Sequence, residues 1–356
     1  MLTTPLRHIG LFSAALVLLA GAGCAATADP HKKVATDYVA VFAATAGAVP
    51  GKSTTAAEPD LIGPHRGLRI TEVSTLEKVD QDEAELVGLD GAVAAEDGYE
   101  LVFALVTGLN GRWYRETADV QVTLAAGSKT VDLLPAMAAG AVFPEGNNVT
   151  DKKVLAVSVP RGKPATIRLV DAGRTQSFDL RAAKRGNDTI AGYYPLRSVD
   201  QLTPYDGVGT ATNVLGESDD DYHVGVSVSA AAIDPYTPDH GWAKAGRAWL
   251  TLSSVSTSSS MTVELAAAVY RLDTAEALTL VTADGKRIGF GDQNVPYVQI
   301  DVGNDGGLVV LDVPADLTSA TLEVDPIGSF DKYDDGRTSA YWQKKPASGG
   351  IPIRFG

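Results

Sequence analysis

Tyr99-Glu100-Leu101-Val102-Phe103-Ala104-Leu105-Val106-Thr107 is a nearly continuous apolar run, and the turn-forming pair Asp97-Gly98 stands directly before it. A short apolar run without alternation is typical of a β-strand that is buried on both faces. The sequence therefore predicts a fully buried strand over residues 99–107.

Shorter strand-like segments with turn residues between them fill the rest of the body. Residues 119–124 alternate, with Val120, Val122 and Leu124 on one face. This spacing favours a β-sandwich or barrel over βαβ units. The one helix candidate is residues 77–86, whose acidic first turn suits a helix N-terminus. Further strands are predicted over residues 153–159, 165–170, 176–180, 222–228, 248–252, 261–270, 278–282, 287–290, 298–302, 308–313 and 320–324.

Two segments of the second half carry sharper local signals. Asp284-Gly285 lies between two predicted strands and predicts a hairpin with a type I′ turn, which needs positive φ at both central residues. The serine-rich run from Ser253 to Ser260 predicts a polar surface loop that leads into the next strand.

The two halves of the body share a sequence pattern. Val157-Ser158-Val159-Pro160 is followed after four residues by Ala165-Thr166-Ile167-Arg168-Leu169-Val170-Asp171. Leu311-Asp312-Val313-Pro314 is followed after five residues by Ala320-Thr321-Leu322-Glu323-Val324-Asp325. Each is a strand, a turn led by proline and a second strand of matching alternation, which indicates an internal duplication.

This duplication predicts equivalent positions in the two halves. Val159 and Val313 are expected to point inward at matching places, and Tyr99 and Tyr222 to lie on the first long strand of each half.

The segment from Asp97 to Val102, with the strands and the Val-Pro pattern behind it, resembles the Ig-like sandwich domains common in actinobacterial lipoproteins and secreted proteins. Leu68-Arg69-Ile70-Thr71-Glu72-Val73 resembles the first strand of such domains. The resemblance covers residues 68–181 well and 222–355 loosely. It implies a fold and no shared active site.

The expected fold class is therefore all-β, with two Ig-like antiparallel β-sandwich domains behind a signal and a flexible tether. The boundaries follow composition shifts: the Ala-, Thr-, Pro- and Gly-rich stretch at the start suits a tether. The predicted parts are a lipoprotein signal peptide over 1–23, the tether over 24–66, sandwich 1 over 67–185, a linker over 186–215 and sandwich 2 over 216–356.

Cys24 is the single cysteine, and it follows one cation (Arg7), an apolar segment and small residues. That order is typical of a bacterial lipoprotein signal, with Cys24 as the lipid-carrying first residue of the mature chain. It predicts a protein anchored to the cell membrane by lipid and facing the extracellular side.

Two alternatives remain open for this segment. Ala26-Thr27-Ala28 is an A-x-A site at which an ordinary signal peptidase would release the chain and discard Cys24. Residues 9–28 are also free of charge and long enough to remain as an uncleaved anchor, although their second half is only weakly apolar.

The formal net charge is −14, from 30 Lys and Arg against 44 Asp and Glu. Such an acidic surface repels nucleic acid, so no nucleic-acid partner is expected. A single cysteine also excludes a disulfide within the chain, so stability must come from apolar cores.

The chain lacks a recognisable catalytic or metal motif. Of its five histidines, His223 and His240 lie in the body, 17 residues apart and without a short-spaced ligand pair. The Ser253–Ser260 run carries no nucleophile-elbow motif. We therefore predict no catalytic residue, no metal and no cofactor.

Aromatic residues supply the one candidate binding site. Tyr236, Trp242 and Trp249 lie in or beside the Pro- and Gly-rich segment 234–246, and Trp342 lies near the C-terminus. Aromatic side chains on loops at the end of a sandwich commonly bind sugars or proteins, but the same rings also fill cores and domain interfaces.

The sequence therefore predicts a non-enzymatic binding or interaction module of the cell envelope, with an envelope protein or a glycan as partner. The alternatives are a cell-wall or carbohydrate-active enzyme that uses carboxylates, and a small-molecule or metal carrier with a pocket between the domains.

Overall fold

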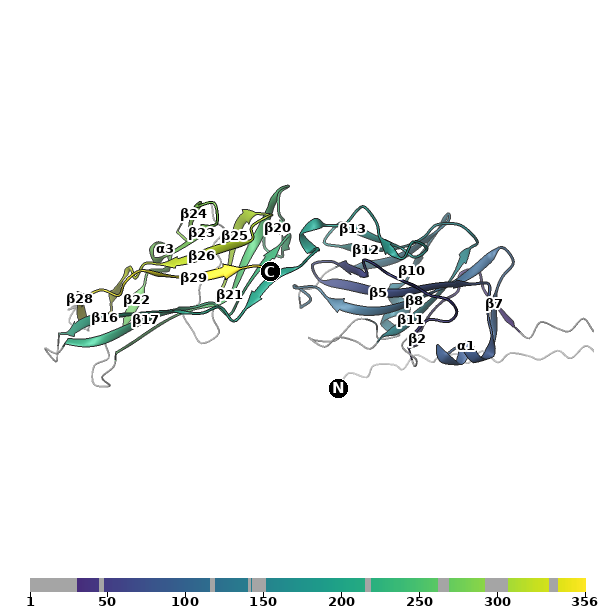
Figure 1. Ribbon diagram of the computed structural model, residues 1–356, viewed down its shortest axis with the longest axis horizontal. Helices are drawn as coiled ribbons and strands as arrows, with labels where there is room; N and C mark the ends of the chain where they lie inside the picture. The colour runs from purple at the N-terminus through teal and green to yellow at the C-terminus, as the bar shows by residue number, and fades with distance from the viewer. Residues whose placement is uncertain are drawn as a thin grey trace, which may run out of the picture.

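The computed structural model describes residues 31–44, 48–115, 119–139, 142, 152–214, 219–261, 269–291, 307–332 and 339–356. About 58% of these residues lie in strands and about 7% in helices. The predicted all-β sandwich class is therefore confirmed. Figure 1 shows two bodies side by side, with the C-terminus between them.

The first sandwich packs a six-stranded sheet against a five-stranded one, and the two sheets enclose an apolar core. The six-stranded sheet runs β2 (Val39–Ala43), β11 (Lys153–Pro160), β8 (Tyr99–Asn110), β5 (Arg66–Leu76) and β3 (Thr54–Thr55), with β4 (Asp60–Ile62) also paired to β5. The five-stranded sheet runs β10 (Lys129–Asp132), β9 (Gln121–Ala126), β12 (Ala165–Asp171), β13 (Arg174–Asp179) and β14 (Lys184–Arg185).

Strand β8 is buried on both faces, as its apolar run predicts. Val102, Ala104 and Val106 point into the core between the sheets. Leu101, Phe103 and Leu105 point the other way, into a second apolar cluster. An additional layer covers that second cluster: β1 (Lys32–Val34), β7 (Val93–Ala95), β6 (Lys78–Val79) and helix α1 (Gln81–Leu86).

The second sandwich packs a four-stranded sheet against part of a seven-stranded one. The seven-stranded sheet runs β15 (Arg197–Asp200), β18 (Ala230–Asp234), β21 (Arg247–Met261), β17 (Asp219–Ser227), β16 (Tyr205–Asn213) and β28 (Ala340–Lys344), and β25 (Gly307–Pro314) also pairs with β21. The four-stranded sheet runs β24 (Arg287–Gly289), β23 (Leu278–Thr282), β26 (Ser319–Val324) and β29 (Gly349–Arg354).

Short elements complete the described parts of the chain. They are the pairs β19 (Tyr236–Thr237) with β20 (Gly241–Trp242) and β22 (Tyr270–Leu272) with β27 (Gly328–Phe330), the helices α2 (Leu134–Ala139) and α3 (Thr274–Ala277), and the 3₁₀ turn η1 (Ala191–Tyr193).

The two sandwiches share one strand order. The sequence β11-β8-β5 in the first corresponds to β25-β21-β18 in the second, and β10-β9-β12-β13 corresponds to β24-β23-β26-β29. Val159 and Val313 are both fully buried, each in the core of its own sandwich, so their predicted inward positions are confirmed. The predicted equivalence of Tyr99 and Tyr222 is wrong. Tyr99 lies on β8, whose counterpart is β21, whereas Tyr222 lies on β17.

The predicted flexible tether over 24–66 is wrong in its described part. Residues 39–43 form β2 and pair with β11, and residues 32–34 form β1 and pair with β7. Val39 and Val41 pack against the core between the sheets and Phe42 packs against the second apolar cluster, so this short segment has apolar contacts on both faces.

The predicted linker over 186–215 is also too long. Residues 197–200 form β15 and residues 205–213 form β16, and both strands belong to the seven-stranded sheet. The connection between the sandwiches therefore ends at Arg197, where β15 begins to pair with β18.

Three local predictions need correction in detail. The hairpin at Asp284-Gly285 is confirmed, but Gly285 alone has positive φ there, and Thr282 and Lys286 close a three-residue loop in place of the type I′ turn. Ser253–Ser260 continues strand β21, and its residues 256–260 pair with β17, because backbone pairing does not require apolar side chains. The predicted helix 77–86 starts at Gln81, after β6.

Cys24 and the whole predicted signal peptide lie outside the described residues. Among the helices that the structure describes, none is long and apolar enough to cross a membrane.

Candidate functional site

Aromatic side chains from both sandwiches meet where the two bodies touch. Tyr236 and Trp242 come from the β19–β20 hairpin of the second sandwich, and their ring centroids lie 5.1 Å apart. His65 of the first sandwich packs edge-on against Tyr236 at 5.6 Å, and Tyr193 of the connection packs edge-on against Trp242 at 6.3 Å. We call His65, Tyr193, Tyr236 and Trp242 the junction cluster.

Hydrogen bonds fix the hairpin against the first sandwich. The indole of Trp242 donates to the carbonyl oxygen of Ala172, at 2.7 Å, in the turn between β12 and β13. The indole of Trp113 donates in the opposite direction, to the carbonyl oxygen of Tyr236, at 3.0 Å. Because each bond joins a ring from one body to the backbone of the other, the two bodies are held in one relative orientation.

The carboxylate of Asp171 holds His65 in place. Asp171 is buried and accepts from the His65 ring nitrogen Nδ1 at 2.6 Å and from the backbone N–H groups of His65 and Arg66. This arrangement fixes the loop before β5 to the end of β12, so the first sandwich presents a preformed surface to the hairpin. His65 therefore has a structural role.

One ion pair crosses the junction. Arg112, in the turn after β8, places Nε 3.0 Å from a carboxylate oxygen of Asp234 at the end of β18. The Asp234 side chain is 3% exposed, and this burial raises its pKa to about 6, against the lowering effect of Arg112. A raised carboxyl pKa is also typical of catalytic acids, but Asp234 faces Arg112 and Thr251 and lines neither of the hollows described below.

The connection between the sandwiches is fastened at both ends. The Tyr194 hydroxyl accepts from the backbone N–H of Ile62 at 2.7 Å and donates to Gln176, both in the first sandwich. The Arg197 guanidinium donates to the carbonyl oxygens of Ala315 and Leu317 in the second sandwich. Two residues separate these anchor points, which leaves little freedom for the two bodies to turn.

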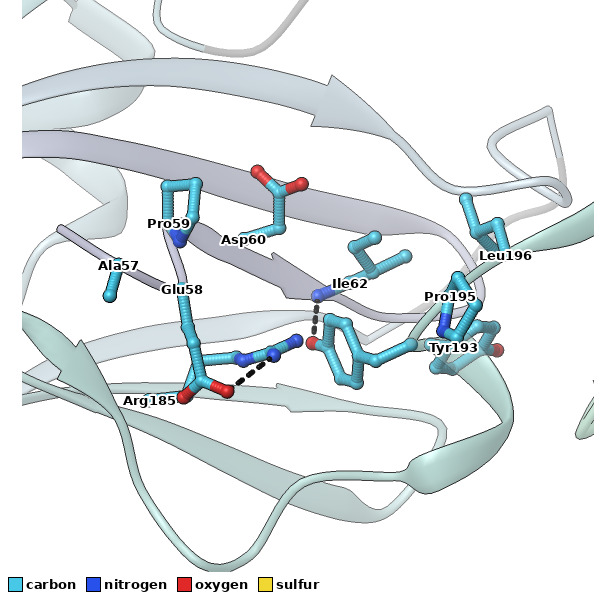
Figure 2. A pocket seen from close by; sticks show the side chains of 10 residues that line it. Ala57, Glu58, Pro59, Asp60, Ile62, Arg185, Tyr193, Pro195 and Leu196 are labelled. Carbon is cyan, nitrogen blue, oxygen red and sulfur yellow. Dashed lines mark hydrogen bonds and ion pairs between the residues drawn. The ribbon is translucent and has the colours of Figure 1, made fainter.

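Figure 2 shows the hollow beside this connection, lined by residues 57–60, Ile62, Arg185 and 193–196. Arg185 stacks on the Tyr194 ring at 3.7 Å and pairs with Glu58 at 3.2 Å. Asp60 is paired with Arg69. Each charged side chain that lines this hollow therefore already has an ion-pair partner within the protein.

A second hollow, of about 680 Å³, lies on another side of the junction. We call it the junction groove. Three stretches contribute to it: residues 173–175 of the first sandwich, residues 188–192 of the connection, and residues 243–248 of the second sandwich, together with Arg197, Pro235 and Ala315. A ligand in this groove would touch both bodies at once.

The aromatic residues that the sequence predicted as a binding site lie in two different places. Tyr236 and Trp242 belong to the junction cluster, and Trp249 lies close by, donating to the carbonyl oxygen of Gly241 at 2.9 Å and packing on His240. Trp342 lies elsewhere in the second sandwich, in a cluster with Tyr222, Tyr270 and Phe330. All four predicted rings are partly buried and pack on protein groups, so their role as ligand contacts remains a prediction.

Sequence reasoning missed the partners of these aromatic residues. Arg112 lies in the turn after β8, Asp171 is the last residue of β12 and Arg174 is the first residue of β13, and no spacing in the sequence links them to residues 234–246. One feature of the sequence could have indicated this contact: the pair Arg112-Trp113 follows the long buried strand directly, and a large aromatic ring in a turn needs a packing partner. Among the described residues, no three His, Cys, Asp or Glu side chains gather in a way that suits a metal ion.

Neither protein-family models nor curated proteins nor solved structures gave a match to this chain.

Proposed function

We propose that this protein is a lipid-anchored binding module of the cell envelope and that it holds its ligand in the junction groove. The anchor rests on the sequence around Cys24. The binding role rests on one observation: two sandwiches are fixed against each other by packed aromatic rings and an ion pair, and the groove beside that contact has walls from both.

Rigid walls favour binding because little conformational entropy is lost when the ligand enters. In the junction groove the first wall is fixed through Ala172, whose carbonyl oxygen accepts from Trp242. The second wall is fixed through Arg247, whose guanidinium donates to the side chain and the backbone carbonyl of Asp312. Because both walls are held in place, the groove is already formed before a ligand binds.

Binding to the envelope is tested by filling the groove. Ala245 is exposed and lines the groove, so Ala245→Trp adds a large ring there without entering either core. Ala283→Trp places the same ring on the exposed β23–β24 turn, away from the groove. We expect the parent and Ala283→Trp to co-sediment with isolated cell-wall material and Ala245→Trp to lose most of that binding. Equal sedimentation of all three proteins would contradict the proposal.

Anchoring is tested separately by Cys24→Ser. The variant is expected to leave the membrane fraction or to remain unprocessed, because the acylated thiol is the attachment point. A variant that fractionates and migrates as the parent does would remove the lipid anchor from the proposal and leave the groove unaffected.

A further inference from the structure

The charge of the junction groove is opposite to that of the whole chain. The protein carries a formal net charge of −14, yet the groove lining holds four cations, Arg174, Arg197, Lys244 and Arg247, against one carboxylate, Asp188. Cations that gather in a concave site of an acidic protein raise the local potential and attract anions to that site.

Two of the four cations are already engaged with the protein. Arg197 donates to two backbone carbonyl oxygens, and Arg247 pairs with Asp312 at 2.8 Å. Both hold the wall of the groove. The carboxylate of Asp188 accepts from the backbone N–H and the hydroxyl of Ser177, at 3.0 and 2.7 Å.

Arg174 and Lys244 are the two cations of the groove that are available to a ligand. Both are exposed, and within the described residues neither forms an ion pair. The Arg174 guanidinium carbon lies 4.3 Å from the centroid of a Trp242 ring, which positions this side chain at the edge of the groove. One cation comes from the first sandwich and the other from the second, so an anion between them would contact both.

We propose that the junction groove binds a phosphorylated ligand, with Arg174 and Lys244 as its principal charge contacts. This inference rests on the proposed function and names the ligand class for the same groove. A guanidinium offers paired donors to phosphate oxygens, and a lysine ammonium adds a mobile point charge. The groove volume of about 680 Å³ lies within the range of small-ligand sites, so it accommodates more than one phosphate group or a phosphate with its organic part.

The test uses inorganic pyrophosphate as the probe, titrated calorimetrically into the full-length protein in detergent at low salt. The variant Arg174→Gln/Lys244→Gln keeps a polar side chain at both positions and removes two charges. The control Lys163→Gln/Lys286→Gln removes two charges from exposed turns outside the groove. We expect at least a tenfold loss of affinity in the groove variant and a change below twofold in the control, with binding that weakens as salt rises.

Three results would overturn the inference: no pyrophosphate binding by the parent protein, equal weakening in the two double variants, or binding of the tricarboxylate citrate as tight as that of pyrophosphate. Equal unfolding midpoints for the parent and both double variants show that a loss of affinity reflects the lost charges and not a change in folding.

The outcomes also distinguish the proposed envelope role from the proposed ligand class. Groove-dependent cell-wall binding without pyrophosphate binding contradicts the ligand class alone, whereas pyrophosphate binding without cell-wall binding contradicts the envelope role alone.

Discussion

Phe103 in the first sandwich and Thr251 in the second occupy equivalent positions on equivalent strands. Phe103 on β8 lies opposite Ala156 of β11, and Thr251 on β21 lies opposite Val310 of β25. Both are fully buried on the outer face of their sheet. The first is covered by apolar residues of the additional layer, and the second donates to the carbonyl oxygen of Ala232 and to Asp234.

This difference explains why one strand is apolar throughout and the other alternates. The first sandwich covers its outer face with its own layer around helix α1, which needs apolar side chains on both faces of β8. Two residues before Thr251 on β21, Trp249 donates to the β19–β20 hairpin, which also carries Tyr236 and Trp242 into the junction. This hairpin therefore contacts both strand β21 and the first sandwich.

The largest expected effect comes from charging one core at a time. Val159→Asp and Val313→Asp each bury a carboxylate with no partner, which costs on the order of 5 kcal/mol or more and exceeds the stability of many domains. Each variant should unfold its own sandwich and leave the other folded. Two-dimensional NMR spectra would show loss of about half of the dispersed peaks, a different half for each variant. Collapse of the whole spectrum in either variant would show a single cooperative unit.

A smaller effect is expected from truncating the two equivalent outer-face residues. Phe103→Ala leaves a cavity in an apolar cluster and should cost about 3–5 kcal/mol. Thr251→Ala removes a methyl group and weak hydrogen bonds, and should cost about 1 kcal/mol. Urea unfolding of both variants measures the difference. Similar losses would mean that the two outer faces are not distinct in the way described above.

A further effect concerns the dependence of stability on pH through Asp234. Its pKa of about 6 lies above the ordinary 3.8, so between these values the folded protein binds more protons than the unfolded one. This contribution to stability is therefore complete below about pH 4 and is lost as pH rises through about 6. It amounts to about 2–3 kcal/mol at most.

Asp234→Asn cannot ionise, so this share of the pH dependence should disappear. The measurement is the free energy of unfolding at pH 5 and pH 7 for the parent, for Asp234→Asn and for Asp200→Asn, which removes an exposed carboxylate. If Asp234→Asn keeps the parent's difference between the two pH values, Asp234 is not the group responsible.

Much of the sandwich architecture was predictable because strand signals are local. The run over 99–107 and the paired Val-Pro patterns identify the central strands and the internal duplication, which the shared strand order supports. The sequence could not place residues 39–43 in the sheet, because this edge strand pairs with residues 153–157, far along the chain.

The candidate site was predictable only in part, for the same reason. Tyr236 and Trp242 were visible as aromatic residues in a loop. Their partners Ala172 and Arg174 come from the β12–β13 hairpin more than 60 residues earlier, and Arg174 joins the other cations of the groove only when the two bodies meet. Contacts of this kind depend on how one sandwich is placed against the other, and no local pattern encodes that placement.

The junction cluster holds the two sandwiches in one orientation. Spin labels on Lys163→Cys and Lys286→Cys, one per sandwich and in a Cys24→Ser background, report the distance between the bodies by pulsed electron resonance. We predict one narrow distance distribution in this doubly labelled protein. Adding Trp242→Ala, which removes a ring and its hydrogen bond to Ala172, should broaden the distribution. Trp342→Ala, remote from the junction, should leave it narrow. A broad distribution in the parent, or one that Trp242→Ala leaves unchanged, would contradict the claim.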